Sequence, residues 1–122
     1  MLRIALITPC LAALCLVLPA LPAAAQRAGA YAVEGRGADG AAYAGAVNLA
    51  PSGPQTWRVT WRVGGETARG VGMMVRNVLV VGYVLNGETG VAAYEQQPDG
   101  RLLGRWTQGR EGGLGTETWL PR

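Results

Sequence analysis

The feature that most constrains the fold is an alternation of apolar and polar side chains with a period of two. The clearest case runs from Gln55 to Val63, where Trp57 and Trp61 fall on one side and Arg58 and Arg62 on the other. Successive side chains of a β-strand point to opposite faces, so this segment predicts a strand with one buried and one wet face. No stretch beyond residue 25 sustains the 3.6-residue period of a helix, which favours an all-β chain.

Seven further segments carry strand signals and are separated by turn residues. The pair Asp39-Gly40 and the pair Asp99-Gly100 are typical of hairpin turns and predict type I′-like geometry. The segment 77–85 is apolar on both faces, which favours a strand covered on both sides or one packed beneath a loop. About eight short strands joined by short connections predict a single small antiparallel meander, most simply a closed or nearly closed β-barrel. The seven segments are 31–35, 43–49, 66–75, 77–85, 90–96, 101–107 and 114–120.

The N-terminal segment has the pattern of a secretory signal peptide. A short basic start, Met1-Leu2-Arg3, precedes a largely apolar run that ends in Ala23-Ala24-Ala25. Pro19 and Pro22 disfavour the alternative, an uncleaved anchor helix. We therefore expect a signal peptide over 1–25, cleavage near Ala25, a β-barrel domain over 26–122, and a periplasmic or secreted protein that meets the membrane only before cleavage.

The composition excludes several kinds of chemistry. The 122 residues contain no His, and all eleven basic residues are Arg. Both cysteines, Cys10 and Cys15, lie in the predicted signal peptide, and the remainder has one serine, Ser52, in a Pro/Gly turn. An activated nucleophile needs a base or thiol that residues 26–122 lack, and these residues have no His, no Cys and no acidic D-x-D-x-D-G loop for a metal. We therefore expect no enzyme activity, no metal and no cofactor. The formal net charge of +3 is too small to predict nucleic-acid binding.

The aromatic and arginine residues supply the candidate ligand site. Large rings with polar atoms recur in ligand cavities and interfaces, and they also fill ordinary cores, so both roles stay open. The arginines of segment 55–63 would lie on its outer face, either as a cationic stripe for anionic surfaces or, more commonly, as an ordinary solvated face. Glu34 and Glu95 are the imaginable pair for glycosidase chemistry, but we expect both to face solvent. The candidate ligand-binding residues are Trp57, Trp61, Arg58, Arg62, Trp106 and Tyr94.

Glu117 is the acidic residue that stands out. Alternation places it on the same face as Gly115 and Trp119. If that face is the interior, Glu117 is a buried carboxylate and needs a partner, for which Arg105 or Arg62 is a candidate. We expect an architectural role for six residues at this strand and at the turns: Glu117, Trp119, Asp39, Gly40, Asp99 and Gly100.

Short Gly, Tyr and Trp motifs give the chain a family resemblance. The motifs are Tyr31-Ala32-Val33-Glu34-Gly35, Asp39-Gly40 with Tyr43-Ala44-Gly45, Trp57-Arg58-Val59-Thr60-Trp61, Gly90-Val91-Ala92-Ala93-Tyr94, Gly104-Arg105-Trp106-Thr107 and Gly115-Thr116-Glu117-Thr118-Trp119. Through these motifs the chain resembles small exported bacterial proteins that are often described as fibronectin-binding.

The resemblance implies an extracellular matrix ligand such as fibronectin, or another host matrix or cell-envelope protein. We therefore expect an exported, non-enzymatic β-barrel that binds a protein or surface ligand. Binding would use strand addition at an exposed edge or an arginine-rimmed aromatic patch. The alternatives are a small-molecule carrier of lipocalin or avidin type with an aromatic internal pocket, and a periplasmic structural or inhibitor protein.

Overall fold

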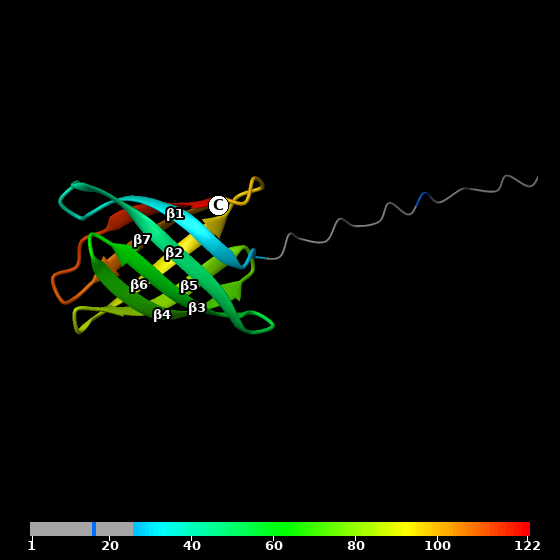
Figure 1. The fold of residues 1–122 in the computed structure, drawn as a ribbon, viewed down its shortest axis with the longest axis horizontal. Helices are drawn as coiled ribbons and strands as arrows, with labels where there is room; N and C mark the ends of the chain where they lie inside the picture. The colour runs from blue at the N-terminus through cyan, green and yellow to red at the C-terminus, as the bar shows by residue number, and fades with distance from the viewer. Residues whose placement is uncertain (1–15, 17–25) are drawn as a thin grey trace, which may run out of the picture.

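Eight antiparallel strands in sequence order form one closed barrel in the computed structural model (Figure 1), as the alternation predicts. The structure describes residue 16 and residues 26–122, so the predicted signal peptide lies outside the described residues except for Leu16. In this part of the chain no helix is long and apolar enough to cross a membrane. The strands are β1 Gly29–Arg36, β2 Ala42–Gly53, β3 Thr56–Val63, β4 Glu66–Val75, β5 Val78–Leu85, β6 Glu88–Gln96, β7 Leu102–Gln108 and β8 Gly115–Pro121.

The first and last strands close the barrel. β1 pairs with β8 from Tyr31 opposite Pro121 to Arg36 opposite Thr116, and every other strand pairs with its sequence neighbours. Closure leaves none of the eight described strands with a free hydrogen-bonding edge. Ligand binding by strand addition, which the sequence suggested, is therefore wrong for this barrel.

The inner face of the barrel is the hydrophobic core. The alternation in β3 is confirmed, because Trp57 and Trp61 are buried while Arg58 and Arg62 are exposed on the outside. Trp119 lies at the centre of the core, with ring centroids 4.3 Å from Tyr94 and 5.8 Å from Trp61. The buried apolar residues are Tyr31, Val33, Val47, Leu49, Trp57, Val59, Trp61, Ala68, Leu79, Val81, Tyr83, Ala92, Tyr94, Leu102 and Trp119.

The two Asp–Gly turns share one geometry, which is not the expected type I′. Only the glycine of each pair, Gly40 or Gly100, has a positive φ, whereas type I′ needs a positive φ at both residues. Gly40 N–H donates to the Gly37 carbonyl at 2.9 Å, and the Asp39 carboxylate accepts the Ala41 N–H at 2.9 Å. These contacts are those of a type I turn followed by a left-handed glycine, a common three-residue hairpin connection.

Strand β2 is longer than the sequence predicts. It runs on to Gly53, past the expected end at Leu49, and its register with β3 shifts between Pro51 and Gly53. Proline cannot donate to a sheet ladder, but a β-bulge accommodates it. The Pro51–Pro54 segment, which looked like a turn, is therefore mostly bulged strand.

The outer face of β4, β5 and β6 carries exposed apolar side chains. Val71 is 70% exposed, and Met73, Val84 and Val91 are each more than half exposed. The expectation that segment 77–85 is covered on both faces is therefore wrong. This part of the barrel is a single layer, and no described segment covers its outside.

Candidate functional site

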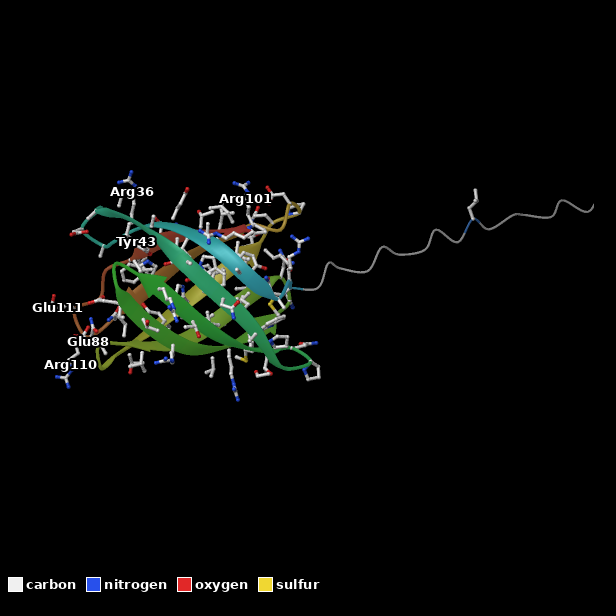
Figure 2. The ribbon with its side chains drawn as sticks, viewed as in Figure 1. Arg36, Tyr43, Glu88, Arg101, Arg110 and Glu111 are labelled. Atoms are coloured by element: carbon white, nitrogen blue, oxygen red, sulfur yellow. The ribbon has the colours of Figure 1, made fainter. Side chains whose placement is uncertain are left out.

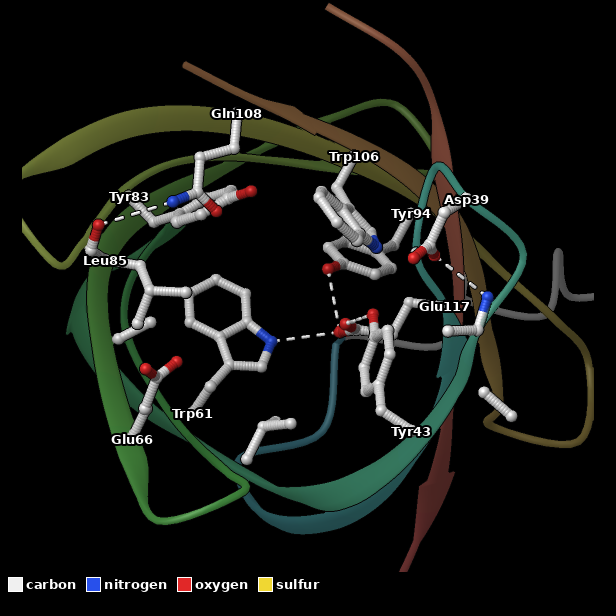
Figure 3. Close-up of a pocket in the computed structure, with 15 residues that line it drawn as sticks. Asp39, Tyr43, Trp61, Glu66, Tyr83, Leu85, Tyr94, Trp106, Gln108 and Glu117 are labelled. Carbon is white, nitrogen blue, oxygen red and sulfur yellow. Dashed lines mark hydrogen bonds between the residues drawn. The ribbon is translucent and has the colours of Figure 1, made fainter.

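A cavity of about 340 Å³ opens at one end of the barrel, inside the ends of the strands (Figure 3). This end carries the β1–β2, β3–β4, β5–β6 and β7–β8 connections, and Figure 2 places Glu88, Arg110 and Glu111 there. The chain termini of the described barrel lie at the opposite end (Figure 1). The lining residues are Gly37, Asp39, Ala41, Ala42, Tyr43, Trp61, Val63, Glu66, Ala68, Tyr83, Leu85, Tyr94, Trp106, Gln108 and Glu117.

Glu117 lies on the floor of this cavity and is 7% exposed. Its Oε1 accepts three hydrogen bonds, from Trp61 Nε1 at 3.0 Å, Tyr94 Oη at 3.0 Å and Trp119 Nε1 at 2.5 Å. Its Oε2 accepts one, from Tyr43 Oη at 2.5 Å. Oε2 therefore keeps a free acceptor position beside the cavity, because a carboxylate oxygen can accept more than one hydrogen bond.

All four partners of Glu117 are neutral donors, which corrects the expected arginine partner. Arg105 and Arg62 are both exposed on the outer face of the barrel. Among the described residues the one ion pair joins Arg101 and Asp99, which lie in the β6–β7 connection. The buried carboxylate is thus satisfied by hydrogen bonds and has no cation beside it.

The negative charge of Glu117 perturbs the tyrosines around it. Burial first, and then the Glu117 charge, raises the pKa of Tyr83 to about 12. The same two causes, together with the hydrogen bonds to Glu117, raise the pKa of Tyr43 and of Tyr94 well above the ordinary value. These tyrosines remain neutral hydroxyl donors across the physiological pH range.

Four of the cavity aromatics are positioned by glycines on neighbouring strands. Tyr43, Tyr83, Tyr94 and Trp106 each lie directly opposite a glycine in the strand register. A Cβ atom at each of those glycines would lie closer than 3.0 Å to the facing ring. The glycines therefore let the rings lie flat across the neighbouring strand, as in aromatic–glycine pairs of other sheets. The four glycines are, in the same order, Gly35, Gly90, Gly104 and Gly115.

Trp106 forms part of the cavity wall. Its ring packs edge-on against Tyr43 with centroids 6.4 Å apart, and its buried Nε1 has no hydrogen-bond acceptor among the described residues. Trp106 and Gln108 also border a second hollow of about 830 Å³ beneath the β7–β8 connection. The cavity thus offers an occupant the free acceptor position of Glu117 Oε2, whereas Trp106 Nε1 is buried within the wall.

The structure brings together some of the predicted ligand residues and separates the others. Trp61, Tyr94 and Trp106 line the cavity. Trp57 is buried near the opposite end of the barrel and does not line it, and its Nε1 also has no acceptor among the described residues. Arg58 and Arg62 point outward from β3, so they cannot rim an internal site.

Two residues expected to be architectural also line the cavity. Glu117 forms the floor, and Asp39 lies at the mouth. Tyr43 and Tyr83 were not predicted as cavity residues. Each faces a glycine on the neighbouring strand, and a tyrosine opposite a glycine in a predicted hairpin could have indicated them.

The remaining acidic residues give neither the glycosidase pair nor a metal site. Glu34 and Glu95 are exposed on β1 and β6, which do not pair with each other, so they do not form the glycosidase pair considered above. No group of three or more His, Cys, Asp or Glu residues within the described ranges could hold a metal ion.

Similar solved structures are designed barrels. "Structure of a redesigned beta barrel, b11L5F_LGL" has a TM-score of 0.71 at 15% identity and covers 78% of this chain and 90% of that one. A second redesigned barrel, mFAP1 bound to DFHBI, has a TM-score of 0.68 at 14% identity and covers 77% and 94%. A de novo designed fluorescence-activating barrel has a TM-score of 0.61 at 16% identity and covers 80% and 94%. No family model and no curated protein matches the chain, and the likeness to these three structures establishes the fold, an antiparallel β-barrel.

Proposed function

We propose that the protein binds a small organic molecule in the cavity at the open end of the barrel, without catalysing a reaction. The observation that carries the proposal is the cavity of about 340 Å³, walled by aromatic rings and floored by a hydrogen-bonded carboxylate. Ligand sites are typically concave, mostly apolar and furnished with a few convergent polar groups, at volumes from about 300 Å³ upward. Small eight-stranded barrels have room for one small ligand.

Two further observations support this function. The polar groups inside the cavity are fixed, because Glu117 is held by four donors and the rings are held against glycines. A preorganised site loses little entropy when a ligand enters. In addition, one similar barrel is bound to DFHBI, and another is described as a fluorescence-activating barrel.

The proposal is tested by blocking the cavity. Ala68 lines it and is 6% exposed, so Ala68→Leu would fill the space beside Trp61. The matched control is Ala44→Leu, which places the same side chain on the exposed outer face of β2. We expect a fluorogenic dye such as thioflavin T to bind the wild type and Ala44→Leu alike, and Ala68→Leu at least about tenfold more weakly. Equal binding to all three proteins would contradict the proposal.

A second candidate function is supported by a different surface. The exposed apolar side chains of β4, β5 and β6 form the kind of patch that marks interaction sites. We propose that this face, and not an arginine-rimmed aromatic patch, would meet a protein partner such as the matrix protein implied by the family resemblance. Replacing Val71 and Val91 with Thr should then abolish fibronectin binding in a surface-capture assay without affecting dye binding in the cavity.

Export of the protein also remains our proposal. We infer that residues 1–25 are removed and that the barrel works in the periplasm or outside the cell. It is supported by the basic start, the apolar run and the Ala23-Ala24-Ala25 end of that segment. Mass spectrometry of the exported protein should give the mass of residues 26–122, and a mass that includes Met1 would contradict it.

A further inference from the structure

The charged residues of the cavity are all acidic, unlike those of the rest of the barrel. Three of its lining residues are acidic, Asp39, Glu66 and Glu117, and none is basic. The described barrel as a whole carries ten arginines and eight acidic residues, a net charge of +2. The acidic character of the cavity is therefore a property of this site and does not follow from the composition.

The charge on the floor is the unusual one. Buried charges are normally paired with an opposite charge, yet the four groups around Glu117 are all neutral. Tyrosine and tryptophan donors satisfy the hydrogen-bonding capacity of the carboxylate, but they leave its net charge uncompensated. Oε2, which accepts a single hydrogen bond, is the atom with room for a further partner.

The walls complement a cation as well. Trp61, Tyr83 and Trp106 all line the cavity, and aromatic faces attract organic cations through their negative quadrupole. The remaining wall is largely apolar, with Ala68 and Leu85 among the lining residues, which suits a hydrophobic body more than a hydrated metal ion.

Resting on the proposed small-molecule function, we propose that the ligand is a small organic cation with an aromatic or apolar body. Its positive centre lies near Glu117 Oε2, and its body stacks among the indole and phenol rings. An anion would meet three carboxylates and no arginine in this cavity. A cation also supplies the opposite charge that the protein itself does not place beside Glu117.

The second hollow is consistent with this assignment. It shares Trp106 and Gln108 with the cavity and is lined by Glu88, Glu111 and one arginine, Arg110. Its charge is thus negative by one, so a cation approaching the mouth from this side is attracted and not repelled.

A matched pair of dyes tests the charge preference. Thioflavin T carries a permanent positive charge, and 2-(4-methylaminophenyl)benzothiazole is a neutral analogue of nearly the same shape. At low ionic strength we expect thioflavin T to bind the wild-type protein at least about tenfold more tightly than the neutral dye. Added NaCl should weaken the binding of thioflavin T and leave that of the neutral dye unchanged.

Two charge-removing variants locate the effect. Glu117→Gln should bring the affinity ratio of the two dyes to near one, while Glu95→Gln, the same change on the exposed outside of β6, should leave the ratio at its wild-type value. If Glu117→Gln does not fold, the double variant Asp39→Asn and Glu66→Gln at the mouth should lower the ratio without touching the floor. A ratio that neither the Glu117 variant nor the mouth variant changes would overturn the inference.

The outcomes separate the inference from the function on which it rests. If the neutral dye binds as tightly as thioflavin T, and Ala68→Leu weakens both, the cavity binds small molecules but does not select cations. If Ala68→Leu affects neither dye, both the proposed function and the inference are overturned.

Discussion

Replacing Glu117 separates its role as a hydrogen-bond acceptor from its role as a charge. Glutamine keeps one oxygen, which can still accept from Trp61, Tyr94 and Trp119, and its NH₂ group can donate to Tyr43 Oη. A hydrogen bond to a charged group contributes about 1.5–3 kcal/mol, against about 1 kcal/mol for a neutral pair, so Gln weakens each bond. It also removes the desolvation penalty of a buried charge, which is several kcal/mol and has the opposite sign. We expect the free energy of unfolding of Glu117→Gln to lie within about 2 kcal/mol of the wild type.

Leucine in the same place removes every acceptor. The hydroxyl of Tyr94 and the indole N–H of Trp119 are then left without an acceptor, because these side chains are 1% and 0% exposed and water does not reach them. Each buried donor without an acceptor lowers the free energy of unfolding by about 1–3 kcal/mol, and the extra apolar burial of Leu raises it by about 1.5 kcal/mol. Glu117→Leu should therefore unfold with a free energy about 1–4 kcal/mol below that of Glu117→Gln.

Urea denaturation followed by tryptophan fluorescence measures both variants. A double-mutant cycle with Trp119→Phe adds a direct readout, because removing the indole N–H should cost about 1–2 kcal/mol less in the Glu117→Leu background than in the wild type. A Leu variant as stable as the Gln variant, together with an additive cycle, would refute the claim that Glu117 organises the core through its donors.

The remaining predictions concern packing and pH. Gly115→Ala should destabilise the barrel by about 1–3 kcal/mol, because the added Cβ would meet the facing indole ring. A Cβ added at Gly82 has no atom within 4 Å, so Gly82→Ala should be neutral or slightly stabilising, and thermal melts of the two variants test the difference. Trp61→Ala should cost about 3–5 kcal/mol in denaturant melts, and Arg62→Ala on the outer face far less; the reverse order would mean that the two faces are wrongly assigned. All four tyrosines have a pKa raised by folding, and that of Tyr83 rises to about 12. The neutral tyrosines stabilise the fold fully below about pH 10, and this contribution is lost as the pH rises through their folded-state pKa values. Phenolate absorbance should therefore appear together with alkaline unfolding and not as a separate step near about pH 10.

The architecture was predictable because it depends on local pattern. The alternation of β3 alone assigns Trp61 inward and Arg62 outward, and short turns between successive strands leave a meander as the simplest arrangement. The outer face of β5 was mispredicted because apolar residues on both faces of a strand do not reveal whether another segment covers the outer face. In this single-layered barrel the described residues leave Val84 about half exposed.

The site was less predictable because it depends on closure. Its acceptor, Glu117, meets donors that lie 74, 56, 23 and 2 positions away in the sequence. Period-two alternation tells which residues point inward, but which inward residues of different strands meet is decided by the register and tilt of the closed sheet. Arginine was the natural partner to expect for a buried acid, and the structure supplies tyrosine hydroxyl and tryptophan indole donors in its place.

The indole N–H resonances of the four tryptophans test the central claim most directly. Each gives one signal in a proton–nitrogen NMR spectrum, and Trp→Phe variants assign them. Upon addition of thioflavin T or its neutral analogue, the signals of Trp61 and Trp106 should shift in proportion to occupancy, because these side chains line the cavity. The signal of Trp57, near the opposite end of the barrel, should stay in place. A shift of Trp57 alone, or binding that leaves both cavity indoles unmoved, would contradict a ligand site in the open end of the barrel.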